Sequence, residues 1–323
     1  SDHFDAARKK ADEWFKHMGR GGSSEEKSLK QVCEAYVAHL AGEGRESASK
    51  DAAGRFKRWI YSNAKLASTS IQKLTQKQID DWRKNLRATL AIPQDKEKAA
   101  TRPRAEGSIN RDMTTLRAAL NLALENGDVT SDHAWKAKLK PIENADGRRD
   151  MYLDQAERRK LIEKASVDLA PFLKALCLLP LRPGAVAALN AGHFDKQLSS
   201  LTIGKDKAGG IRKISLPPAT AAFFAEQAKG KLPTTPLFAR ADGKRWDKDA
   251  WKEPVKKAAN AAGLPVAVTA YTLRHSTIPD LVNNGLPTLT VAQLSGTSVA
   301  MIEKHYGHLQ QRQAAAALAM LSL

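Results

Sequence analysis

Four short segments in the second half of the chain carry side chains that could act on a phosphate. They are Leu181-Arg182-Pro183-Gly184, the stretch around Lys207, Tyr271-Thr272-Leu273-Arg274-His275, and Leu294-Ser295-Gly296-Thr297 with His305-Tyr306-Gly307-His308. Guanidinium groups bind phosphate oxygens through paired donors and stay charged at neutral pH. A phenol has a pKa of about 10, so it attacks a phosphate only with help from a base and a cationic pocket. Each segment alone is a weak signal, and their order along the chain is the stronger one.

A hairpin and several helices are expected to position these segments. Asp154 and Glu157 form the capping-box pattern that opens a helix. Leu201-Thr202-Ile203 and the stretch 211–216 are rich in β-forming residues and flank a Gly-Gly turn. This pattern predicts a hairpin that carries Lys207.

The first half of the chain is expected to be helical throughout, because apolar residues recur there at helical spacing. The expected helices cover residues 5–18, 29–42, 48–63, about 75–88 with a cap at Thr75, and a long segment that Ser108 caps and Gly127 ends. A polar, charged stretch at 91–107 contains two prolines and predicts a loop. A second polar run at 143–149 predicts a domain boundary.

The chain is strongly basic. Its 323 residues include 52 Lys and Arg against 35 Asp and Glu, a formal net charge of +17. An excess of this size indicates a polyanionic partner, because each neutralised phosphate releases condensed counterions. Charge alone does not separate an enzyme from a passive binder, or either of them from a protein that is simply basic.

The composition argues against several classes of protein. No apolar run approaches the roughly 20 residues that span a bilayer. Cys33 and Cys177 lie far apart in apolar stretches, which indicates buried thiols in a reducing compartment. His305 and His308 are spaced to share a helical face, but the sequence indicates no further ligand that would complete a metal site. We therefore expect a cytoplasmic protein without a membrane anchor or a metal.

In their order and spacing, the four segments resemble the motifs of the tyrosine recombinase family, which includes the phage-type integrases. The resemblance covers residues 148–309 and implies a mostly helical catalytic domain with a small β-hairpin. Residues 24–140 are similar in size and pattern to the family's helical core-binding domain. The resemblance also implies that 1–23 is a linker helix following a missing arm-binding domain, and that 310–323 is a helix that docks on a neighbouring protomer. The expected fold class is mainly α with a small β-sheet (α+β).

The resemblance implies catalytic roles for seven residues, which are Arg182, Lys207, Tyr271, Arg274, His275, Thr297 and Tyr306. Tyr306 would attack a DNA phosphodiester and form a 3′-phosphotyrosyl link, which conserves bond energy, so rejoining needs no ATP, metal or other cofactor. Arg182 and Arg274 would bind the non-bridging oxygens, where negative charge builds up. Lys207 would protonate the leaving 5′ oxygen. Lys205 replaces Lys207 in this role if the hairpin register is shifted by two residues.

Three positions depart from the family's usual pattern. Tyr271 stands where His usually opens the third motif, Thr297 where His or Trp usually sits, and Ala185 where an acidic residue usually follows the first Arg. The hydroxyls of Tyr271 and Thr297 can hydrogen-bond a phosphate oxygen, but neither is a base at neutral pH. We hypothesise that His275 takes over part of the proton transfer. Because of these three departures, one alternative is a catalytically weakened DNA-binding protein on the same scaffold. A second alternative is a type IB topoisomerase, which uses the same chemistry.

Basic side chains away from the apolar faces are expected to hold double-stranded DNA. The candidates are Lys57, Arg58, Arg111 and Arg117 in the first domain, and Lys205, Arg212 and Arg245 in the second. Contacts of this kind set register on a duplex but do not choose a sequence. The resemblance further implies a homo-tetramer on two DNA sites, a possible accessory DNA-bending protein, and a location at the prokaryotic nucleoid.

Overall fold

The computed structural model describes residues 26–93, 99–145, 151–204 and 210–307, with scattered positions among the first 15. The chain divides into two compact units, Ser1–Gly147 and Arg148–Leu323, and each has its own hydrophobic core. Lys205, Lys207 and the expected C-terminal helix at 310–323 lie outside the described residues, as does most of the expected linker helix at 1–23. No helix in the described part of the chain combines the length and apolar character needed to cross a membrane.

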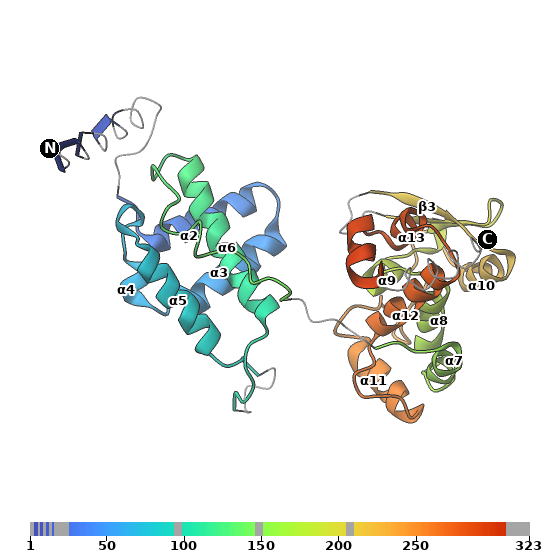
Figure 1. The fold of residues 1–323 in the computed structure, drawn as a ribbon. Helices are drawn as coiled ribbons and strands as arrows, with labels where there is room; N and C mark the ends of the chain where they lie inside the picture. The colour runs from blue at the N-terminus through green and yellow to red at the C-terminus, as the bar shows by residue number, and fades with distance from the viewer. Residues whose placement is uncertain are drawn as a thin grey trace, which may run out of the picture. The chain divides into compact units, whose positions relative to one another are not determined.

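The first unit is built from helices, as the apolar periodicity predicts (Figure 1). Its elements are α2 (Leu29–Gly42), α3 (Glu46–Trp59), α4 (Ala64–Ala67), the 3-10 turn η1 (Ile71–Lys73), α5 (Gln76–Ala88) and α6 (Glu106–Glu125). The Thr75 cap is confirmed, since its side chain accepts a hydrogen bond from the Gln78 amide. The predicted end of α6 is also confirmed, because Gly127 has a φ of 75° that suits a residue without a Cβ.

Two helix boundaries in this unit differ from the prediction. Ser108 does not cap α6, because the helix begins earlier, and the Ala105 carbonyl accepts the Ser108 amide at 2.8 Å. The end of α3 falls at Trp59 rather than at 63. Asn63 instead caps the short helix α4, where its side chain accepts from the Leu66 amide at 3.1 Å.

A buried ion network joins α3, α6 and the loop before α6. Asp112 is 3% exposed and accepts hydrogen bonds from Arg55 Nη1 at 2.6 Å and from Arg104. Arg55 also donates to Asp51 through Nε at 2.7 Å. The Arg104 guanidinium lies over the Trp59 ring, 4.1 Å from its centroid. The two guanidinium groups therefore share one buried carboxylate, and the exposed Asp51 supplies a second negative charge to Arg55.

The second unit combines helices with a small sheet at one edge (Figure 1). Its elements are α7 (Gln155–Glu163), α8 (Leu169–Leu178), α9 (Pro183–Ala187), the 3-10 turn η2 (Ala191–His193), β1 (Phe194–Asp195), β2 (Ser200–Ile203), β3 (Arg212–Ser215), α10 (Pro218–Ala228), α11 (Lys252–Ala261), α12 (Ala270–Asn283) and α13 (Thr288–Ser295). The sheet is antiparallel with the order β1-β2-β3. The predicted hairpin is confirmed as β2 and β3, with Ile203 opposite Arg212, while the two-residue strand β1 was not predicted. The mainly helical fold class with a small β-sheet is confirmed.

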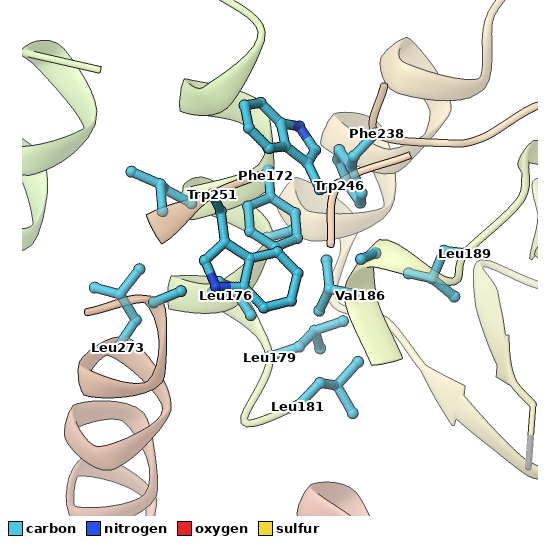
Figure 2. Packing of buried hydrophobic residues seen from close by; sticks show 14 of the residues in the cluster. Phe172, Leu176, Leu179, Leu181, Val186, Leu189, Phe238, Trp246, Trp251 and Leu273 are labelled. Carbon is cyan, nitrogen blue, oxygen red and sulfur yellow. The ribbon is translucent and has the colours of Figure 1, made fainter. Parts of the chain in front are cut away.

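The hydrophobic core of this unit holds in place the backbone from which Arg182 and Arg274 project. Phe172 of α8 stacks on Trp246 and Trp251, with ring centroids 5.9 and 5.4 Å away (Figure 2). Leu181 and Leu273 are fully buried in the same cluster (Figure 2). Because they directly precede Arg182 and Arg274, the packed core determines where both arginine side chains begin.

Tyr306 belongs to a smaller cluster. Residues 299–307 are helical, and Ile302 is buried there against residues of α12 and α13. Tyr306 packs partly buried on this cluster rather than on the main core. The tyrosine is thus brought to α12 by a few apolar contacts at the end of the described chain.

Candidate functional site

Arg274 lies at the centre of the site and is held by two backbone carbonyls. It projects from α12, whose N-cap Thr269 forms a capping box with Thr272. Only 6% of Arg274 is exposed, and its Nη1 donates to the carbonyl oxygens of Pro180 at 2.5 Å and Ser295 at 2.7 Å. These bonds tie α12 to the segment before Arg182 and to the end of α13.

Arg182 binds the next carbonyl along the same turn. It is the N-cap of α9, and its Nη1 donates to the Gly296 carbonyl at 2.5 Å. Gly296 closes α13 in the left-handed conformation, with φ 63° and ψ 51°. The carbonyl end of a helix carries partial negative charge, which favours cations there. The turn at Ser295 and Gly296 therefore orients both arginines predicted to bind phosphate.

Arg212, predicted to contact DNA, also lies at this turn. An ideal Cβ built on Gly296 would fall 2.5 Å from both Nη1 and Nη2 of Arg212. The guanidinium therefore rests directly on the Gly296 backbone, where only a glycine leaves room. The start of β3 is thus in contact with the end of α13.

The nucleophile candidate contacts the histidine that follows Arg274 in α12. His275 Nδ1 lies 2.8 Å from the Tyr306 hydroxyl, a distance at which either atom can donate, depending on the tautomer. His275 follows Arg274 in α12, and Tyr271 lies one helical turn earlier and is 39% exposed. Thr297 follows Gly296 and donates its amide to the Ala292 carbonyl. Six of the seven predicted catalytic residues thus come from three neighbouring segments, and Lys207 lies outside the described residues.

Burial shifts the pKa values of Arg274 and Tyr306 in opposite directions. Burial lowers the pKa of Arg274 to about 10, with help from the positive charges of Arg182 and Arg212. The guanidinium remains protonated at neutral pH. Burial raises the pKa of Tyr306, and the charge of Arg274 only partly offsets this. The site can therefore bind an oxyanion, but its phenol needs a base in order to react.

The other predicted DNA contacts differ in exposure. Lys57, Arg58 and Arg111 are exposed and Arg117 is half-buried in the first unit. Arg245 donates to the Ala187 and Leu189 carbonyls at 3.3 and 3.4 Å and to the Asn190 side chain, so it braces the end of α9. Lys205 lies outside the described residues.

Sequence reasoning missed the role of the carbonyls and of Gly296. A Gly after a helical stretch indicates a left-handed C-cap, so the conformation of Gly296 was readable. The arginines that contact this turn come from distant parts of the chain, so local sequence patterns could not predict their contacts with it. Within the described residues no group of three or more His, Cys, Asp and Glu side chains could hold a metal ion, and His308 lies outside them.

Comparisons with known proteins agree with this geometry. Residues 152–313 match the model of the phage integrase family, a span of half the chain. The Tn1549 transposon integrase in complex with transposon right end DNA has a similar structure, with a TM-score of 0.70 and 17% identity over 90% of this chain and 99% of that one. A lambda integrase dimer bound to a COC′ core site has a TM-score of 0.64 at 17% identity, over 89% of this chain and 79% of that one. Identities this low support the fold alone. Comparison with curated protein sequences gives no match.

Proposed function

The chain belongs to the phage integrase family and is a tyrosine-type site-specific DNA recombinase, and we propose that Tyr306 is its nucleophile. In this proposal the phenol oxygen forms a bond to the scissile phosphorus, and the bond from phosphorus to the 5′ oxygen breaks. The product is a 3′-phosphotyrosyl link and a free 5′ hydroxyl, which a second DNA strand can attack to reverse the step. The observation that carries the proposal is the 2.8 Å contact between the Tyr306 hydroxyl and His275.

His275 is proposed as the base that removes the phenol proton. A neutral imidazole accepts through one ring nitrogen, and Nδ1 is within hydrogen-bonding distance of the hydroxyl. The raised pKa of Tyr306 makes such a base necessary, because little phenolate forms by itself at neutral pH. The hydroxyls of Tyr271 and Thr297 would donate hydrogen bonds to the phosphate in place of the family's usual imidazole or indole.

The arginines are proposed to bind the non-bridging phosphate oxygens. Arg182 donates Nη1 to one backbone carbonyl and Arg274 donates Nη1 to two, and a guanidinium carries five N–H donors in all. Oriented cations in a water-poor site stabilise the charge that develops in the transition state. Lys207, or Lys205 in a shifted register, would protonate the leaving 5′ oxygen.

Double-stranded DNA is the proposed substrate, held in part by Lys57, Arg58, Arg111 and Arg117. The similar lambda integrase has been solved as a tetramer bound to a Holliday junction, with a TM-score of 0.63 and 16% identity over 84% of this chain and 78% of that one. We infer a homo-tetramer on two DNA sites for this chain, assisted by a DNA-bending protein and located at the nucleoid.

A suicide DNA substrate, nicked so that the cleaved fragment is lost, tests the proposal. Wild-type protein should accumulate a covalent protein–DNA adduct, and Tyr306→Phe should form none while binding DNA with unchanged affinity. If wild-type protein forms no adduct on its own attachment site, the protein binds DNA but does not cut it. Relaxation of supercoiled DNA without site preference would instead indicate a topoisomerase.

A further inference from the structure

Arg212 lies in the catalytic cluster rather than on an outer surface. Arg212 pairs with Ile203 at the end of the β2–β3 ladder, and Lys207 lies between these two residues in the sequence. Its Nε and Nη2 atoms are shielded from solvent. The residue as a whole is half-buried, so this shielded edge of its guanidinium faces the protein rather than a DNA backbone.

The contact with Gly296 connects Arg212 to the other two arginines. The flat face of the Arg212 guanidinium covers the Gly296 backbone, where a Cβ would come within 2.6 Å of Cζ. The carbonyl of the same glycine accepts from Arg182, and the preceding Ser295 carbonyl accepts from Arg274. A shift of this turn would therefore move both phosphate-binding arginines together.

The charges in the cluster are consistent with a role in the reaction. The positive charges of Arg182 and Arg212 both contribute to lowering the pKa of Arg274, so the three guanidinium groups are close enough to repel one another. Gathering like charges costs free energy in the empty site. An anion bound between them, such as the scissile phosphate, would relieve that repulsion.

We infer that Arg212 is a positioning residue of the catalytic centre, which holds the turn at Gly296 and so aligns Arg182 and Arg274 on the scissile phosphate. This inference rests on the proposed function. It makes Arg212 necessary for the rate of cleavage rather than for DNA affinity. It also explains why the fourth motif needs a glycine directly before Thr297.

The rate of adduct formation in the bound complex tests this inference, with Arg212→Met compared with Lys213→Met. Lys213 is exposed and its side chain leaves the opposite face of β3, so the control removes the same charge one residue away. At saturating protein on the suicide substrate, Arg212→Met should slow cleavage by about 100-fold, because a small misplacement of catalytic groups costs about that much. Its DNA affinity and melting temperature should stay close to those of wild type, and Lys213→Met should cleave at the wild-type rate.

Two further variants separate positioning from charge and from folding. Arg212→Lys keeps the charge but not the flat guanidinium, and it should remain well below the wild-type rate. Gly296→Ala should be slow in the wild-type background because its Cβ displaces Arg212, while the strain of a left-handed alanine is the same with or without Arg212. Added to Arg212→Met, it should cost much less than it does alone, because the displaced group is gone.

The outcomes separate this inference from the function on which it rests. An Arg212→Met protein that cleaves at the wild-type rate, or that only loses affinity, would overturn the inference. So would full activity of Arg212→Lys, or fully additive losses with Gly296→Ala. If wild-type protein forms no adduct at all, the proposed function fails and the inference fails with it.

Discussion

Arginines withdrawn from the surface are stabilised in different ways in the two units. In the first unit, Arg55 and Arg104 share the buried carboxylate of Asp112. In the second, Arg274 is more deeply buried than Arg55, yet its described hydrogen bonds go to the neutral carbonyls of Pro180 and Ser295. A carboxylate cancels the charge of a guanidinium, whereas a carbonyl fixes its orientation and leaves the charge in place.

The pKa shifts of Arg55 and Arg274 differ in the same way as their hydrogen-bond partners. Burial alone would lower the pKa of Arg55, but its hydrogen bonds to Asp51 and Asp112 outweigh burial and raise it. Arg274 has no carboxylate among the described groups that shift its pKa, which falls to about 10. The first arrangement stabilises a fold, and the second keeps a cation available for an anionic ligand. This difference separates the arginines of the Asp112 network from the arginine that we propose to bind the scissile phosphate.

The largest effect expected from this comparison is on Arg274. Arg274→Lys keeps a positive charge but cannot bridge two carbonyls and a phosphate, so single-turnover cleavage should fall by about 1000-fold. DNA affinity should change by only a few fold, because the lost interaction forms mainly in the transition state. A drop in affinity that matches the drop in rate would show that Arg274 serves binding.

A smaller loss, with a change in pH dependence, is expected for His275→Ala. Cleavage at neutral pH should fall by about 100-fold, as removal of a general base usually causes. Because burial raises the pKa of Tyr306, the phenol stays protonated below pH 10, and the phenolate fraction grows about tenfold per pH unit there. The variant's rate should therefore rise steeply with pH, whereas the wild-type rate should be flatter. Parallel profiles for the two proteins would rule out His275 as the base.

The effect expected in the first unit is on stability alone. Asp112→Asn leaves two arginines without their shared carboxylate, which should cost about 3 kcal/mol in the opening free energy of α6. Asp51→Asn is the matched control, because Asp51 binds the same Arg55 but its side chain is 62% exposed, so about 1 kcal/mol or less is expected. Hydrogen exchange of the α6 amides measures both. Equal losses would mean that burial does not distinguish the two carboxylates.

Local patterns in the sequence predicted most of the secondary structure. The bounds of α2, the caps at Thr75 and Asp154, and the β2–β3 hairpin depend on residues close in sequence, and these were predicted correctly. The cap at Ser108 was wrong, because the Ala105 carbonyl takes the place of a side chain. Helix ends are set by whichever acceptor is nearest, and that acceptor need not be a side chain.

The sequence predicted which residues belong to the site, but not which of them contact one another. The bond between His275 and Tyr306 spans 31 positions and that between Arg182 and Gly296 spans 114, so neither follows from local spacing. The buried network around Asp112 had a visible signal, since this residue interrupts the apolar stripe of α6 between Ile109 and Leu116. A charged residue in such a stripe indicates a buried partner, but does not identify it.

Mass spectrometry of the trapped protein–DNA adduct tests the central claim most directly. After nuclease and protease digestion, the account predicts a single modified peptide in which Tyr306 carries a nucleotide through its 3′ phosphate. The complementary product should carry a free 5′ hydroxyl. A modified residue other than Tyr306, or a link through a 5′ phosphate, would contradict the proposed nucleophile and the polarity of cleavage.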